Sequence, residues 1–157
     1  MKKTFLFLSI TCMLLLGGSC IKGDENCQPK SIASETAAMQ AFATSQGMTP
    51  TTHASGLLYQ IINPGSGFTA SPTSRIYVKY TGKLEDGSVF DSQSNHALTG
   101  WVLGTLIAGW QVGVPLIQKG GTIKLIVPSS MAYGCASAGT IRSNSILYFE
   151  IELVDVQ

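Results

Sequence analysis

Apolar residues recur at every second position in three segments of the C-terminal two-thirds of the chain. The segments are residues 76–80, 122–127 and 145–156. In the first of them, Ile76 and Val78 fall on one side of the alternation, and Tyr77 and Lys79 fall on the other. Because successive side chains of a β-strand point to opposite faces, a period of two predicts a strand with one buried face.

The last of these segments also predicts which side chains meet solvent. Its apolar face holds Leu147, Phe149, Ile151 and Leu153, and its other face holds Tyr148, Glu150 and Glu152. We expect this second face, with its two glutamates, to be solvated.

Turn-forming residues separate further elements from these strands. A strand at 57–62 ends at the Asn-Pro-Gly cluster of 63–67, and Asp86-Gly87 predicts a hairpin whose return strand starts at 89–90. Residues 107–116 have helical spacing, and Gly120-Gly121 breaks the helical pattern beyond them. The sequence therefore predicts an α+β fold of about five antiparallel strands around one short helix.

A second helix is predicted ahead of the sheet. Residues 31–46 contain good helix formers, Ser31 or Ser34 can cap the N-terminus, and Gly47 stands where a helix-ending glycine belongs. The polar residues 21–30 are interpreted as a tether, and the threonine-rich residues 48–55 as a linker.

The first twenty residues have the order of a secretory leader. Two lysines precede an apolar run at 4–16, small residues follow at 17–19, and Cys20 comes next. The run is short for a membrane-spanning helix. Small residues directly before a cysteine resemble a bacterial lipoprotein box, which implies a signal peptide at 1–19, lipidation of Cys20 and an exported, membrane-anchored protein. A plain cleaved leader is the alternative.

Two cysteines, Cys27 and Cys135, remain after the predicted leader. Export permits a disulfide between them, and this pairing is our interpretation. Two free thiols or an intermolecular bond are the alternatives.

Composition and motifs disfavour several other functions. A formal net charge of +1 without a basic stripe gives no basis for nucleic-acid binding. His53 and His96 are isolated and no Cys-x-x-Cys occurs, so we expect no metal and no other cofactor. Neither a Gly-x-Ser-x-Gly motif nor a phosphate-binding glycine loop is present.

A series of short motifs in residues 56–156 resembles the FKBP family of peptidyl-prolyl cis-trans isomerases. In chain order they are residues 78–87, Phe90-Asp91-Ser92, Leu103-Gly104, Leu106-Ile107, Gly109-Trp110, residues 120–128, Ala132-Tyr133-Gly134 and residues 148–153. Each motif alone is weak, but their order and spacing together are specific. The resemblance implies a twisted antiparallel sheet wrapped around one short helix, with residues 56–157 as the isomerase domain.

The resemblance also implies an apolar pocket for proline. Its residues would be Tyr80, Phe90, Asp91, Trp101, Leu106, Ile107, Trp110, Tyr133, Ile141 and Phe149. Trp110 would form the floor, the Ile107 N–H and the Tyr133 hydroxyl would donate hydrogen bonds to substrate, and Asp91 would organise the pocket.

An aromatic pocket suits this chemistry. Rotation about an Xaa–Pro bond crosses a barrier of about 20 kcal/mol and breaks amide resonance. The twisted amide is less polar than the planar one, so a desolvated aromatic pocket can bind it preferentially, which is what catalysis requires.

The resemblance implies proline-containing polypeptides as partners, binding of macrolides of the FK506 and rapamycin type, and no cofactor. We expect a monomer, because the N-terminal helix is short. A non-catalytic peptide-binding or partner-binding lipoprotein is the alternative, and a structural envelope lipoprotein is a third class.

Overall fold

A computed structural model describes residues 26–157; the predicted leader at 1–19 and the candidate lipidation site Cys20 lie outside the described residues. The strands are β1 (Thr51–Thr52), β2 (Leu58–Asn63), β3 (Arg75–Lys83), β4 (Val89–Gln93), β5 (Trp101–Val102), β6 (Thr122–Val127) and β7 (Leu147–Val156). The helices are α1 (Ile32–Ser45) and α2 (Ala108–Gly113). Short 3₁₀ turns are η1 (His96–Leu98), η2 (Leu103–Thr105), η3 (Val114–Leu116) and η4 (Ser129–Met131).

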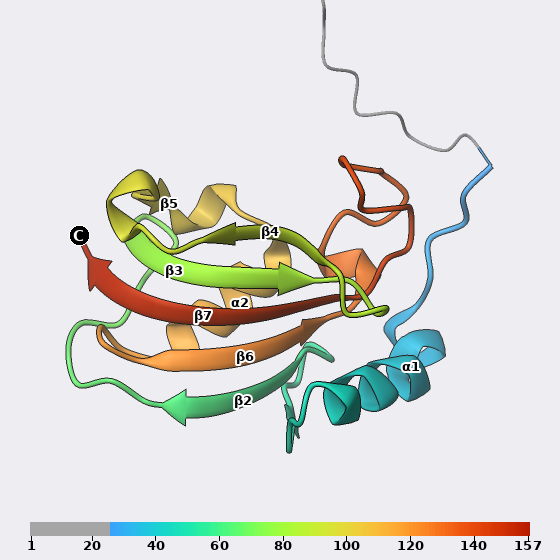
Figure 1. Cartoon of the computed structure of the whole chain (residues 1–157), viewed down its shortest axis with the longest axis horizontal. Helices are drawn as coiled ribbons and strands as arrows, with labels where there is room; N and C mark the ends of the chain where they lie inside the picture. Colours follow the sequence, from blue (N-terminus) through green and yellow to red (C-terminus); the bar gives the residue numbers. More distant parts are fainter. Residues whose placement is uncertain (1–25) are drawn as a thin grey trace, which may run out of the picture.

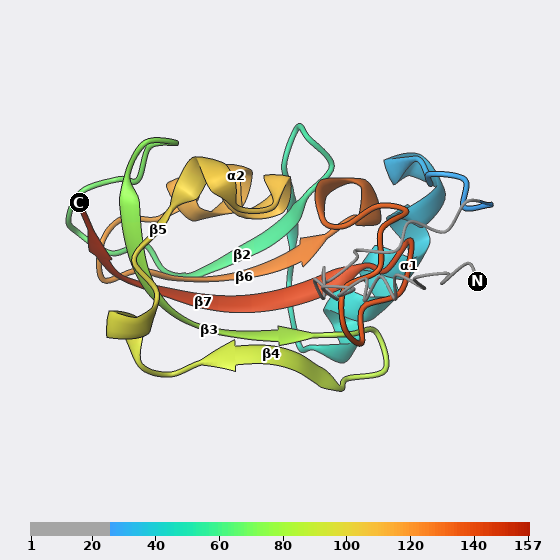
Figure 2. The ribbon, with the colours of Figure 1, turned by 90° about the horizontal axis from the view of Figure 1, so that it is seen from above.

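The strands form one antiparallel sheet in the order β1-β2-β6-β7-β3-β4, and β5 pairs with the start of β3. The sheet is twisted, and α2 lies across one of its faces (Figures 1 and 2). The predicted α+β fold with an additional N-terminal helix is confirmed. The sheet has more strands than the five expected, because β1 and β5 have two residues each and leave no periodic signal.

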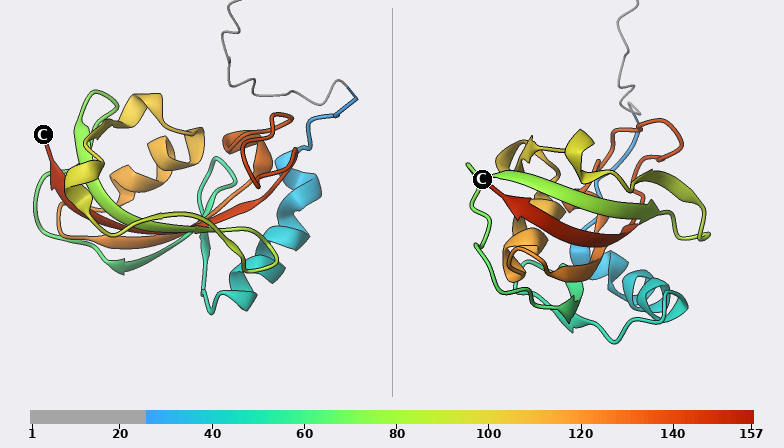
Figure 3. Two further views of the ribbon diagram at one scale, coloured as in Figure 1. Left: turned by 45° about the horizontal axis from the view of Figure 1, so that its top comes forward. Right: turned by 60° about the vertical axis from the view of Figure 1, so that its left-hand side comes forward.

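The helix α1 packs against the sheet face opposite α2 (Figure 3). Phe42 and Met39 of α1 join a cluster with Ile126 and Tyr148, whose exposed fractions are 0% and 2%. The prediction that the Tyr148 face of β7 is solvated is therefore wrong at Tyr148, although Glu150 beyond the helix is exposed.

Two other expectations need correction. Residues 48–55 are not a free linker, because Met48 is buried and β1 pairs with β2. The helix expected at 107–116 is α2 followed by η3, since Pro115 lacks the N–H that an α-helix would need there.

The predicted N-cap of α1 is confirmed, because the Ser31 hydroxyl accepts a hydrogen bond from the Ser34 N–H.

The helix α2 lies close to the sheet because glycine occupies the contact. A Cβ on Gly109 would come within 2.4 Å of Val127 Cγ1. Gly109→Ala would gain about 1 kcal/mol of helix propensity but overpack a buried β-branched side chain, which costs about 1–3 kcal/mol. We expect a net loss of unfolding free energy in urea titrations. An unchanged or higher stability would mean that α2 can move off the sheet without cost.

Glu35 joins α1 to the turn that leads to Tyr133. Its side chain is 2% exposed, and Glu35 Oε2 accepts the Ser129 N–H at 2.9 Å. Because Glu35→Ala leaves this buried N–H without an acceptor, we expect a loss of about 1–3 kcal/mol in unfolding free energy. Glu85→Ala, at an exposed site, is the matched control. Equal stability of the two variants would contradict this assignment.

Candidate active site

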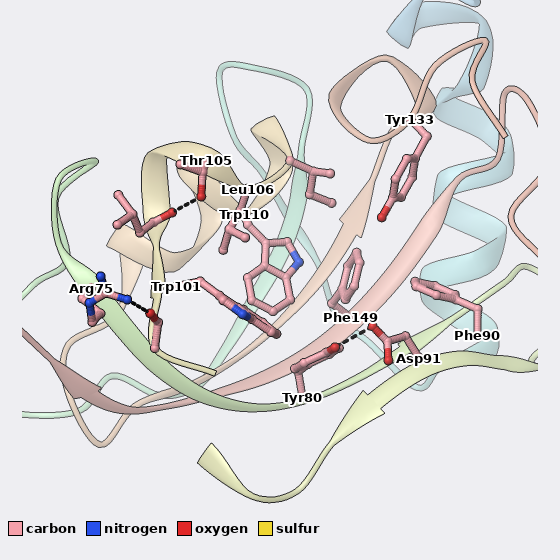
Figure 4. A pocket seen from close by; sticks show the side chains of 13 residues that line it. Arg75, Tyr80, Phe90, Asp91, Trp101, Thr105, Leu106, Trp110, Tyr133 and Phe149 are labelled. Carbon is pink, nitrogen blue, oxygen red and sulfur yellow. Dashed lines mark hydrogen bonds between the residues drawn. The ribbon is translucent and has the colours of Figure 1, made fainter. Parts of the chain in front are cut away.

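A cavity of about 420 Å³ opens between α2, the concave face of the sheet and the segment that carries Tyr133 (Figure 4). Nine of the ten residues predicted for the pocket line it. They are Tyr80, Phe90, Asp91, Trp101, Leu106, Ile107, Trp110, Tyr133 and Phe149. The structure therefore brings together side chains from β3, β4, β5, α2 and β7 that lie up to 69 positions apart in the chain (149 − 80 = 69).

Trp110 is the centre of the aromatic wall. Its ring centroid lies 5.3 Å from those of Tyr80 and Phe149 and 6.4 Å from that of Trp101. Phe90 extends the wall by contacting Phe149 at 5.6 Å, edge to face. Rings in this arrangement attract one another and hold each other's rotamers, so the cavity is formed before any ligand enters.

The indole nitrogen of Trp110 has no hydrogen-bond acceptor among residues 26–157. It lies on the side of the ring that faces Phe149 (Figure 4), and the two ring planes meet at 89°. The aromatic rings packed around Trp110 make the floor of the cavity apolar.

A hydrogen-bonded pair, Tyr80 and Asp91, lies in the aromatic wall. The Tyr80 hydroxyl donates to Asp91 Oδ2 at 2.5 Å, between the paired strands β3 and β4. Burial raises the pKa of the Tyr80 hydroxyl, and the hydrogen bond to Asp91 raises it further. Tyr80 therefore stays protonated at neutral pH and fixes the Asp91 carboxylate at the edge of the cavity.

Phe90 reaches its position because the facing residue of β3 has no side chain. A Cβ on Gly82 would come within 2.5 Å of Phe90 Cζ. The ring instead lies directly over the backbone of β3 and against Phe149. Phe90 is only partly buried, so much of its surface is available to a ligand.

The start of α2 presents a free hydrogen-bond donor to the cavity. Ile107 caps the helix, and no acceptor among residues 26–157 takes its backbone N–H. Gln111 fixes the preceding segment, because its Nε2 donates to the carbonyls of Leu106 and Gly104 at 2.7 and 3.1 Å. The Ile107 N–H is thus held at the rim of the cavity.

Tyr133 lies across the cavity from α2 and directs its hydroxyl inward (Figure 4). The loop that follows it is fastened to the N-terminal arm by a disulfide between Cys27 and Cys135, whose Cα atoms are 5.6 Å apart. Asn144 adds a second attachment, since its Nδ2 donates to the Gln28 carbonyl at 2.9 Å.

Ile141 is the one predicted pocket residue that does not line the cavity. Its side chain is 5% exposed and belongs to the core cluster that also contains Phe149. Four lining residues were not predicted: Arg75, Gly100, Val102 and Thr105. Arg75 of β3 pairs with Val102 of the two-residue strand β5, Gly100 precedes that strand and Thr105 follows it. A strand this short leaves no period in the sequence that could have predicted these residues. No group of three or more potential metal ligands occurs in residues 26–157.

The raised tyrosine pKa values predict a loss of stability at high pH. Burial, together with the charge of Glu150, raises the pKa of Tyr148, as burial does for Tyr80. As pH rises above about 10, the unfolded chain releases these protons first, so stability present below pH 10 is lost above it. The slope reaches at most about 1.4 kcal/mol per pH unit for each tyrosine. Urea titrations at pH 9 to 11 should show a shallower loss in Tyr148→Phe; equal slopes would contradict the assignment.

Comparison with known proteins shows the family to which this chain belongs. A family model for the FKBP-type peptidyl-prolyl cis-trans isomerase matches residues 67–154. FkpA of Escherichia coli (strain K12), named an FKBP-type peptidyl-prolyl cis-trans isomerase, is 38% identical over 119 residues, which are 75% of this chain and 43% of that protein. The chain thus spans less than half the length of this curated relative.

Solved structures give the same result. The crystal structure of FkpA from Escherichia coli matches with a TM-score of 0.68 and 35% identity, covering 80% of this chain and 58% of that one. A peptidyl-prolyl cis-trans isomerase from Pseudomonas syringae pv. tomato matches with a TM-score of 0.66 and 28% identity, covering 83% of this chain and 99% of that one.

Proposed function

The chain belongs to the family of FKBP-type peptidyl-prolyl cis-trans isomerases, and from this membership we propose that it accelerates rotation about Xaa–Pro bonds of exported polypeptides. The observation that carries the proposal is the preformed aromatic cavity around Trp110. Its volume of about 420 Å³ is in the range of sites that enclose a small ligand.

Catalysis follows from binding the twisted amide better than the planar one. In this proposal the proline ring lies on Trp110 between Tyr80, Phe90 and Phe149, which are aromatic residues of the cavity lining. Resonance is lost as the bond twists, so the amide becomes less polar and is better tolerated by this apolar wall. A preference of about 1.4 kcal/mol accelerates rotation tenfold. The reaction forms no covalent intermediate and needs no cofactor.

Three polar groups orient the substrate. The unpartnered N–H of Ile107 and the inward hydroxyl of Tyr133 donate to substrate carbonyls on either side of the proline. Asp91, fixed by Tyr80, lies beside the carbonyl that rotates. Trp101 and Leu106 contact the neighbouring substrate side chains.

The test of this function is isomerisation of a short Xaa-Pro peptide by the purified protein, with and without rapamycin. We expect an accelerated rate that rapamycin abolishes by occupying the aromatic cavity, and a lower rate in Tyr80→Ala. Acceleration that rapamycin does not affect would place catalysis outside this cavity.

The proposed organisation of the chain is a signal peptide at 1–19, a tether with a short helix at 20–55, and the isomerase domain at 56–157, whose sheet β1 joins from the preceding region. Export is supported by the leader pattern and by the Cys27–Cys135 disulfide, since disulfides persist in oxidising compartments. Within residues 26–157, no helix has the length and apolar character needed to cross a membrane.

Lipidation of Cys20 would anchor the exported, monomeric protein to a membrane of the cell envelope. Each acyl-chain methylene buried in the bilayer contributes about 0.8 kcal/mol to membrane binding, so two or three acyl chains would hold the protein firmly at the membrane. Cys20→Ser should release the protein from the membrane fraction of the producing cell. Continued partitioning of this variant with membranes would refute the anchor.

A further inference from the structure

The cavity has two ends of different chemistry. Figure 4 shows Phe90, Asp91 and Tyr133 at one end and Arg75 at the other, with the two tryptophans between them. Arg75 is the only cationic side chain among the thirteen lining residues, and Asp91 is the only carboxylate. The two charges are not equally available, because Asp91 already accepts the Tyr80 hydroxyl.

The fold fixes Arg75 at its end of the cavity. Its backbone exchanges two hydrogen bonds with Gln157, at 2.7 and 2.9 Å, and its Cα pairs with Val102 of β5. The guanidinium donates from Nη1 to the carbonyl of Gly100 (Figure 4). This contact uses one of five N–H donors, so the side chain is oriented while most of its donors are free.

Arg75 takes part in no salt bridge within residues 26–157. The ion pairs within residues 26–157 join Lys79 to Glu152 and Lys119 to Asp155, and neither involves Arg75. An exposed, oriented and unpaired guanidinium beside an apolar cavity favours a carboxylate in a bound ligand, because charge-assisted hydrogen bonds are stronger than neutral ones.

A polypeptide bound by its proline must pass over the ends of the cavity. An extended chain advances about 3.3 Å per residue, so the residues within two or three positions of the proline lie near the rim. We propose that Arg75 determines specificity, favouring substrates with an acidic side chain near the proline, on the side where the peptide leaves over β5. This inference rests on the proposed isomerase function and deepens it.

The experiment uses peptides Ac-Ala₃-Xaa-Pro-Ala₃-NH₂ in which one alanine is replaced by glutamate at each position in turn. For the wild type we expect one position at which glutamate raises kcat/KM about three- to fivefold over alanine, a magnitude typical of a partly exposed ion pair. In Arg75→Gln this ratio should fall to about one, and in Arg75→Glu below one. High salt should reduce the wild-type ratio.

Lys124→Gln is the matched control, because it removes one positive charge from β6 on the sheet face away from the cavity. Its glutamate-to-alanine ratio should equal that of the wild type. The proposal is overturned if no glutamate position is favoured by the wild type, or if Arg75→Gln keeps the wild-type ratio. If the isomerase function itself fails, no peptide will be accelerated. The Kd of each peptide, measured by fluorescence anisotropy, would then decide the role of Arg75 through the same comparison of glutamate with alanine peptides.

Discussion

Alanine at Phe90 is expected to lower kcat/KM for prolyl isomerisation by about tenfold to a hundredfold while the protein stays folded. Phe90 forms one wall of the cavity, over Gly82 and against Phe149. Burial of one such ring against a ligand contributes about 1.5–3 kcal/mol, and loss of that contact in the transition state converts directly into rate. The measurement is a peptide isomerisation assay alongside circular dichroism and urea unfolding.

Val89→Ala provides the control for Phe90→Ala. Val89 is the preceding residue of β4, its side chain is 56% exposed, and it does not line the cavity. We expect its activity to equal that of the wild type. If Phe90→Ala is folded and as active as Val89→Ala, the aromatic wall does not contribute to catalysis.

Removal of the disulfide is expected to cause the largest loss of stability. The bond between Cys27 and Cys135 spans 108 positions of sequence and so restricts the unfolded chain strongly. Disulfides typically contribute about 2–4 kcal/mol to stability. The double variant Cys27→Ser/Cys135→Ser should lose this amount in urea titrations, without the intermolecular pairing that a single free thiol permits.

Reduced wild-type protein is the internal control for this prediction. Dithiothreitol should lower its stability to that of the double variant and leave the double variant unchanged. Alkylation of the denatured, non-reduced wild type should leave both cysteines unmodified. Two alkylated thiols, or equal stabilities of all forms, would contradict the assignment.

The strands of the sheet were predictable where one face is solvated. The alternation of apolar and polar residues predicted β3 and β7 because it matches their burial: in β3, Ile76 and Val78 are buried, while Lys79 contacts solvent. The face of Tyr148 was mispredicted because α1 has few apolar residues, and nothing in its sequence indicates which part of the sheet it covers. Burial of that face depends on a contact between segments about a hundred residues apart.

The pocket was predictable in its aromatic part and not at its charged end. The FKBP motifs located the rings around Trp110, and the structure places nine of the ten candidates around one cavity. Ile141 instead belongs to the core cluster, and its segment forms an isolated bridge between Ala138 and Ile141 that no motif in the sequence indicates. Arg75 escaped prediction because its partner strand β5 has two residues and follows the turn η1.

The most direct test of the central claim is NMR exchange between the cis and trans signals of an Xaa-Pro peptide at substoichiometric protein. A catalyst must raise the cis–trans exchange rate of the whole peptide pool, whereas a binding module only broadens or shifts signals. We predict exchange at least a hundredfold faster than the uncatalysed process, which takes tens to hundreds of seconds. Binding of the peptide without faster exchange would contradict the account and favour a non-catalytic role for this cavity.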